Sequence, residues 1–315
     1  MQVGTPTTPR GPSLSLTITI IYGRYTNIDF KDFDLGLKQL PNGVYLPKPE
    51  AVFSINVEPE FITMDNNDRY AYLTLQENNA IAVFDILKLE IVSIFALGTH
   101  DFGFSGLDAS DIDQAIDIRK YANLYGLRQS DGITYFRNKI SNKQYVLTAN
   151  EGNPKIFDTL RVNAVQLNSV AFPNGDILKD DMHLGRLKVL TNGGEQYGEN
   201  EDGTFSALYT FGTRDFIIFE IETDDDDGGD CACEFPHGMR LALSSYDDFE
   251  QITAAFGEAN SFNSDFYNPS FDSRRFVYSM FSETVFMICM TVMTKGPNRN
   301  QSRLESVAMA IRMCL

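Results

Sequence analysis

The sequence predicts an all-β fold of the β-propeller type, and three observations along the chain predict it. The first is a series of short runs rich in β-branched and aromatic residues, at 60–64, 71–75, 80–86 and 91–97. The second is the set of short polar connectors between these runs, at 65–68, 76–79 and 87–90. The third is the spacing of four strands in about forty residues, which is typical of one propeller blade.

Further strands are expected on either side of this four-stranded unit. Residues 14–22 offer one strand before it, and residues 131–137 and 144–149 offer a pair after it. A second set is expected at 185–190, 207–211 and 215–221. Short helices are expected within 109–125, where Ser110 or Asp111 would be the N-cap, and within 249–256.

Composition limits the class of protein. An apolar share of 43% in 315 residues excludes a disordered chain and allows a sizeable core. The formal net charge of −17 argues against nucleic-acid and anionic-membrane partners, because both require a basic surface. The same charge is compatible with cations or a mineral surface.

The last forty residues differ from the rest of the chain. Residues 276–315 carry four basic and two acidic side chains, a net charge of +2, so that residues 1–275 carry −19. The apolar stretch 276–294 has the length of a membrane helix, but it contains Glu283 and no Leu, which disfavours that interpretation. The N-terminal residues 1–13 are polar and Pro-rich, and no signal peptide is visible there.

Acidic side chains in long connectors are the main chemical feature of the sequence. One group, in 107–117, contains Asp108, Asp111, Asp113 and Asp117. A second, in 220–230, contains Asp224, Asp225, Asp226 and Asp227, and a third contains Glu195, Glu199, Glu201 and Asp202. Clustered carboxylates can bind calcium, so the first two groups are candidate calcium ligands. The first group does not fit the EF-hand spacing, and helix capping or solvated loops are the alternative.

Enzymatic chemistry has little support in the sequence. The three histidines have no G-x-S-x-G companion, and no phosphate-binding loop of the G-x-x-x-x-G-K-[ST] type is present. A hydrolase acting on phosphate esters remains the alternative, with cations available at Arg128, Arg161, Arg186 and Arg214. Glu77 and Glu151 follow predicted strand ends, where they could bind a ligand or belong to turns stabilised by the neighbouring Asn side chains.

Ten segments in order carry a family resemblance. They include EPEFI (58–62), TLQENNAIAVFDI (74–86), LDASDID (107–113), ANEG (149–152), RV (161–162) with AFPN (171–174), LGRLKV (184–189), LYTFGTRDFIIF (208–219), DDFEQITA (247–254), FNSDF (262–266) and SFDSR (270–274). Over residues 28–274 the chain resembles the choice-of-anchor I domain family, whose animal members are mesenchyme-specific cell surface glycoproteins. The resemblance implies a seven-bladed, YVTN-like propeller that is extracellular or at the cell surface.

The resemblance also sets the expected organisation and partners. We expect a poorly matched segment at 1–24, an incomplete propeller at 25–275, and a tail at 276–315 that derives from a retained intron or a misprediction. Open blade faces of such a fragment would favour self-association. The implied function is non-enzymatic and linked to biomineralisation, with calcium as the ion and mineral, matrix components or other extracellular proteins as partners. Membrane attachment would require an anchor outside this chain.

Overall fold

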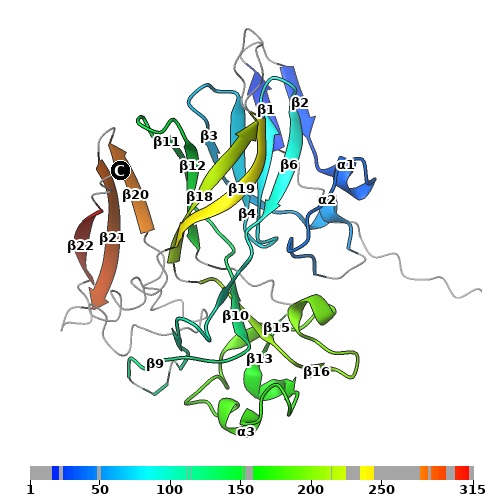
Figure 1. The fold of residues 1–315 in the computed structure, drawn as a ribbon, viewed down its shortest axis with the longest axis vertical. Coiled ribbons are helices and arrows are strands. Elements are labelled where there is room, and N and C mark those ends of the chain that lie inside the picture. Colours follow the sequence, from blue (N-terminus) through cyan, green and yellow to red (C-terminus); the bar gives the residue numbers. More distant parts are fainter. Residues whose placement is uncertain are drawn as a thin grey trace, which may run out of the picture.

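The structure is a computed structural model, shown in Figure 1, and it describes most of the chain. The described residues are 16–20, 24–47, 51–110, 112–113, 115–150, 152, 159–213, 215–224, 235–244, 277–282, 285–295 and 302–311. These residues form an all-β fold of several small sheets with a few short helices, and within them no sheet closes into a barrel.

The predicted four-stranded meander is confirmed. Strands β3 (Pro59–Met64), β4 (Tyr70–Leu75), β5 (Ala80–Asp85) and β6 (Glu90–Ala96) form one antiparallel sheet in chain order. Every residue of β4 and β5 is buried, because both faces of this sheet are covered. The turns between strands contain Asp68, Asn79 and Leu89 in the left-handed conformation.

A second four-stranded antiparallel sheet contains the predicted strand pair. Its order is β11 (Ile133–Arg137), β12 (Gln144–Asn150), β18 (Asp215–Asp224) and β19 (Phe235–Ser244). Between β12 and β18 the chain leaves the sheet for a separate region and returns. The sheet therefore has the same simple strand order as the first, with a long excursion inserted at its centre (Figure 1).

The two sheets pack face to face with like strands next to each other. The first strands, β3 and β11, are in contact, and so are the last strands, β6 and β19. The Tyr72 and Tyr135 rings stack with centroids 6.0 Å apart, and the Tyr135 backbone N–H donates to Thr63 Oγ1 at 3.1 Å. Around them lies a shared core that includes Tyr70, Ile81, Val83, Val146, Ile217 and Phe219.

The N-terminal part of the chain covers the opposite face of the first sheet. The hairpin of β1 (Leu16–Ile20) and β2 (Arg24–Ile28) confirms a strand within 14–22. After it, helices α1 (Lys31–Asp34) and α2 (Phe53–Asn56) bring Phe30, Phe33 and Phe53 together, with ring centroids 5.7–6.4 Å apart. These rings pack with side chains of β4 and β5 in one core cluster.

Residues 99–127 and 159–213 form a second region, the lower lobe, at the bottom of Figure 1. It has its own core, which includes Leu124, Leu184, Leu187 and Leu208. Its elements are short: β7 (Thr99–Asp101), β8 (Leu107–Asp108), β9 (Ile118–Arg119), β10 (Leu124–Leu127), β13 (Thr159–Arg161), the 3₁₀ turn η2 (Val162–Ala164), β14 (Gln166–Leu167), α3 (Gly175–Leu178), β15 (Lys188–Leu190), the 3₁₀ turn η3 (Gly194–Tyr197), β16 (Thr204–Phe205) and β17 (Leu208–Phe211).

Two predictions for this part of the chain are wrong. The helix expected within 109–125 is replaced by β9 and β10, and the Ser110 hydroxyl donates to the Asp181 carbonyl at 3.0 Å instead of capping a helix. The strands expected as one set at 185–221 belong to three sheets: β15 pairs with β13, β17 with β10, and β18 with β12. The helix expected at 249–256 lies outside the described residues.

The apolar tail forms strands and not a helix. Strands β20 (Val277–Ser282), β21 (Val285–Lys295) and β22 (Ser302–Ile311) make an antiparallel sheet. Across the described ranges, no helix has the length and apolar character needed to cross a membrane.

Candidate functional site

Polar side chains gather where the two sheets meet the lower lobe. We call this place the junction, and define it by Gln76–Asn79, Arg128–Ser130, Asn150 and Thr213–Asp215. With the exception of Arg214, which lies outside the described residues, all of these residues are buried. Buried polar groups are costly unless they are hydrogen-bonded, so their partners decide what the junction does.

The two asparagines of the β4–β5 turn bind backbone groups. Asn78 Nδ2 donates to the carbonyls of Tyr45 and Asn56, at 3.0 and 3.3 Å. Asn79 Nδ2 donates to the Gly98 carbonyl at 2.9 Å, and its Oδ1 accepts from the Gln129 backbone N–H at 3.0 Å. The predicted turn is present, but its asparagine side chains bind backbone groups of distant segments and not those of the turn itself. Glu77 is also buried there, and Glu151 lies outside the described residues.

Asp215 is the most deeply buried acid among the described junction residues. Its carboxylate accepts hydrogen bonds from three side chains. Asn150 Nδ2 donates to its Oδ1 at 2.6 Å, Thr213 Oγ1 donates to the same oxygen, and Ser244 Oγ donates to its Oδ2 at 3.3 Å. Burial raises the pKa of Asp215 to about 6, against these donors and the Arg128 charge, which lower it. The carboxyl therefore joins the end of β12 to the start of β18, where the excursion leaves and returns.

A serine and a histidine lie together on the lobe side of the junction. His100 Nε2 and Ser105 Oγ are hydrogen-bonded, an arrangement that in hydrolases activates the serine. Burial, together with the nearby Arg128 charge, lowers the pKa of His100 to about 3. An imidazole with that pKa is a weak base, so this pair is poorly suited to nucleophilic catalysis.

Two glycines allow the backbone to close around the junction. A Cβ on Gly152, whose φ is +84°, would lie 2.2 Å from the Gly212 nitrogen. A Cβ on Gly98, whose φ is +73°, would lie 3.2 Å from Arg128 Nη1, and this guanidinium donates to the neighbouring Leu97 carbonyl. Only glycine combines this conformation with such close approach.

The described aspartates of the first acidic group do not converge. Asp108 is fully buried in β8, whereas Asp113 is half-buried and its Oδ1 accepts from the Ala115 backbone N–H at 3.1 Å. Asp117 forms a salt bridge with Arg119. Asp111 lies outside the described residues. These three carboxylates thus have three different environments.

The other acidic groups are only partly described. Asp224 is the last residue of β18, and Asp225, Asp226 and Asp227 lie outside the described residues. In the third group, Asp202 Oδ1 accepts from Thr204 Oγ1 at 2.6 Å and from its backbone N–H at 3.0 Å, and these bonds lower the pKa of Asp202. Within the described ranges, no three His, Cys, Asp or Glu side chains are close enough to hold a metal ion.

Two of the four arginines named as candidates for phosphate binding donate to backbone carbonyls. Arg128 donates to the Leu97 carbonyl in the junction, and Arg161 donates to the Arg186 carbonyl within the lower lobe. Arg214 lies outside the described residues.

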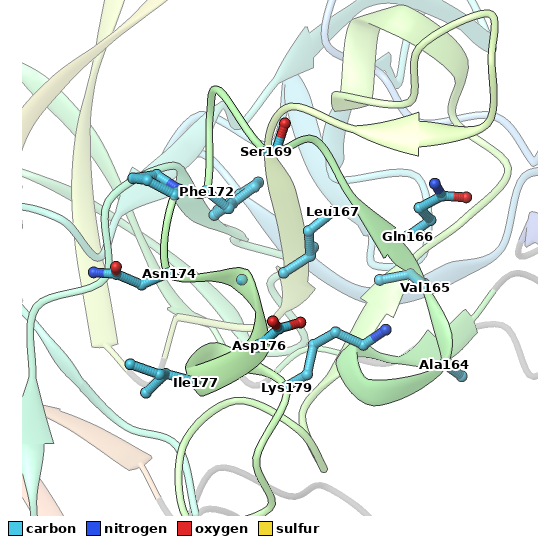
Figure 2. A pocket seen from close by; sticks show the side chains of 12 residues that line it. Ala164, Val165, Gln166, Leu167, Ser169, Phe172, Asn174, Asp176, Ile177 and Lys179 are labelled. Carbon is cyan, nitrogen blue, oxygen red and sulfur yellow. The ribbon is translucent and has the colours of Figure 1, made fainter.

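An open groove of about 670 Å³ lies on the lower lobe beside β14 and α3. Figure 2 shows Leu167 at its centre, with Gln166 on one side and Asp176 and Lys179 on another. Phe172 belongs to the lobe core and Leu167 packs against it, so the lining combines apolar side chains with the polar side chains of Gln166, Asp176 and Lys179. Such a recess is of the size that small ligands occupy. Sequence analysis missed it, because η2, β14 and α3 are too short to give a periodic signal.

One comparison with known proteins gave a match. The family model of the choice-of-anchor I domain matches residues 12–274, which is most of the chain. The chain belongs to the choice-of-anchor I domain family. Neither the curated proteins nor the solved structures contain a match to it. Choice-of-anchor domains suggest a cell-surface or extracellular protein, and the family is not a known enzyme family.

Proposed function

We propose that this choice-of-anchor I chain is a non-enzymatic binding protein of the cell surface or extracellular space, built on a β-propeller scaffold. The observation that carries the proposal is the packing of the two four-stranded sheets. Adjacent blades of a propeller lie face to face with equivalent strands side by side. The contacts of β3 with β11 and of β6 with β19 follow that arrangement. On this interpretation residues 25–275 form the propeller-type unit and 276–315 a separate tail.

The chemistry of the described polar residues favours binding over catalysis. The junction residues Asn78, Asn79 and Arg128 hold backbone carbonyls, and Asp215 holds strand ends together. The Ser105–His100 pair contains a weak base. We therefore place phosphate-ester hydrolysis second, and turnover of a chromogenic phosphate ester would favour that alternative.

Within this function we propose weak calcium or mineral contact through the acidic loops. It is supported by the charge of −17 and by the four consecutive aspartates at 224–227, which create a high local density of negative charge. This contact would not require a closed coordination cage, and it would make mineral or matrix components the partners. The link to biomineralisation and to the mesenchyme-specific glycoproteins is part of the same proposal.

Calorimetric titration of the chain with calcium tests this contact. We expect millimolar binding that is weakened by replacing Asp224–Asp227 with Asn. A matched variant with four neutral replacements at Glu195, Glu199, Glu201 and Asp202 should weaken it less, because those charges are further apart in the sequence. Absence of binding at millimolar calcium, or an equal loss in both variants, would contradict the assignment to 224–227.

A further inference from the structure

Strand β3 exposes apolar side chains at the edge of the first sheet. Phe61, Ile62 and Met64 have 53%, 51% and 52% of their surface exposed. At the opposite edge, every residue of β6 is buried or half-buried. In the described part of the chain, no strand pairs with the other edge of β3, and β11 packs against its face. Edge strands of this kind pair readily with other chains.

Backbone groups of β3 also point outward. The Asp65 N–H donates to the Tyr70 carbonyl at 2.9 Å, and Thr63, two residues earlier, is paired with Tyr72. In an antiparallel pair, hydrogen-bonded positions alternate with positions whose N–H and C=O point the other way. Ile62 and Met64 are at the alternate positions. Their backbone groups are therefore directed away from β4, toward the free edge.

The surroundings of this edge are acidic. Glu60 is an exposed residue of β3. Thr74 Oγ1 accepts from the Phe61 N–H at 3.0 Å and donates to the Asp131 carbonyl at 2.8 Å, which brings Asp131 beside the strand. Burial, together with the charges of Asp131 and Glu58, raises the pKa of Glu60. A cation placed here would relieve this repulsion.

We propose that the free edge of β3 binds an extended segment of a partner protein in which apolar residues alternate with Lys or Arg. Strand addition would satisfy the outward backbone groups, while the apolar side chains would cover Ile62 and Met64. A second copy of this chain fits less well: β3 has an acid and no basic residue, and two copies carrying −17 each would repel. The inference goes beyond the proposed function, because it depends neither on the acidic loops nor on a closed propeller.

Fluorescence anisotropy with two labelled ten-residue peptides tests the proposal on the full chain. One peptide alternates Val with Lys and the other alternates Val with Glu. Met64→Pro removes an outward N–H without removing a hydrogen bond to β4. Glu60→Gln removes the charge alone, and Val170→Ser removes an exposed apolar side chain of the lower lobe (89% exposed) as the matched control.

We expect saturable binding of the Val/Lys peptide only. Met64→Pro should weaken it at least about tenfold, as expected for loss of a ladder hydrogen bond and its apolar contact. Glu60→Gln should weaken it roughly two- to fivefold at low salt, and Val170→Ser should leave it unchanged. If Met64→Pro does not fold, the comparison of the two peptides and the Glu60→Gln variant still test whether the Val/Lys peptide binds at β3. Equal binding of both peptides, wild-type binding by either β3 variant, or self-association without peptide binding would overturn the proposal.

Discussion

The two four-stranded sheets and the lower lobe bury their apolar side chains in different ways. In the sheets, whole strands such as β4 and β5 are buried on both faces, and their neighbours in space are mostly their neighbours in sequence. In the lower lobe, strands of two to four residues and tight turns surround a core that includes Leu124, Leu184 and Leu208. The arrangement of the two sheets therefore follows mainly from regular strand order, whereas the arrangement of the lower lobe depends on packing between segments far apart in the sequence.

The junction shows how such different regions are held together. Asn79 lies in a turn of the first sheet and binds the backbone at Gly98 and Gln129, which flank the first passage through the lower lobe. Asp215 binds Asn150 and Thr213, which flank the second passage. The lobe is therefore fastened at its base by buried hydrogen bonds, separately from its apolar core.

The largest effect on stability is expected from a substitution that creates a cavity in one core or the other. Ile81→Ala, between the two sheets, and Leu184→Ala, in the lower lobe, each remove a fully buried side chain. Each should lower the free energy of unfolding by about 2–5 kcal/mol. Hydrogen exchange should then accelerate in β4, β5 and β12 for Ile81→Ala, but only in the lower lobe for Leu184→Ala, because the two clusters are separate. Identical exchange patterns would show that the regions unfold as one unit.

A smaller effect is expected from the pH dependence of the junction. The folded-state pKa of Asp215 is about 6, above its ordinary value of 3.8, so the folded protein binds this proton more tightly than the unfolded chain. Its contribution is fully present below about pH 4 and is lost as pH rises through 6, a change of roughly 3 kcal/mol.

Asp215→Asn provides the control for this pH dependence. The amide keeps the size of the side chain but does not titrate, so the fall in unfolding free energy between pH 4 and 7 should become shallower by most of that amount. Urea denaturation at several pH values measures it. A variant with the same slope as the wild type would contradict the role given to Asp215.

The smallest effect is expected when a substitution in a junction turn is compared with the same substitution in an exposed turn. Asn79 and Asn142 both have positive φ values, of 53° and 61°, but Asn79 is buried and Asn142 is exposed. Both Ala variants lose the conformational preference of Asn for this region. Asn79→Ala also removes the hydrogen bonds of this side chain to the Gly98 carbonyl and the Gln129 N–H. This loss should lower the free energy of unfolding by an additional amount of about 1–3 kcal/mol. Equal thermal shifts in the two variants would argue that these bonds contribute little.

Sequence reasoning succeeded where burial and strand order are local. The runs at 71–75 and 80–86 were predictable because strands covered on both faces are nearly continuously apolar, and the Asn-rich turn between them was predictable from turn chemistry. It failed within 109–125, where the Ser110 hydroxyl binds the distant Asp181 carbonyl, a contact that leaves no local signal. The acidic groups were visible in the sequence, but their described members do not converge.

The all-β class, the strands of the first sheet, the hairpin of β11 and β12, and the family were all predictable from the residue sequence. Each depends on residue patterns within short stretches of the chain. The three-dimensional structure was needed to show that β12 pairs with β18 across the excursion, that β17 pairs in parallel with β10, and that Asp215 is buried among Asn150, Thr213 and Ser244. The physical reason is that strand pairing and the burial of polar groups depend on partners far away in the sequence.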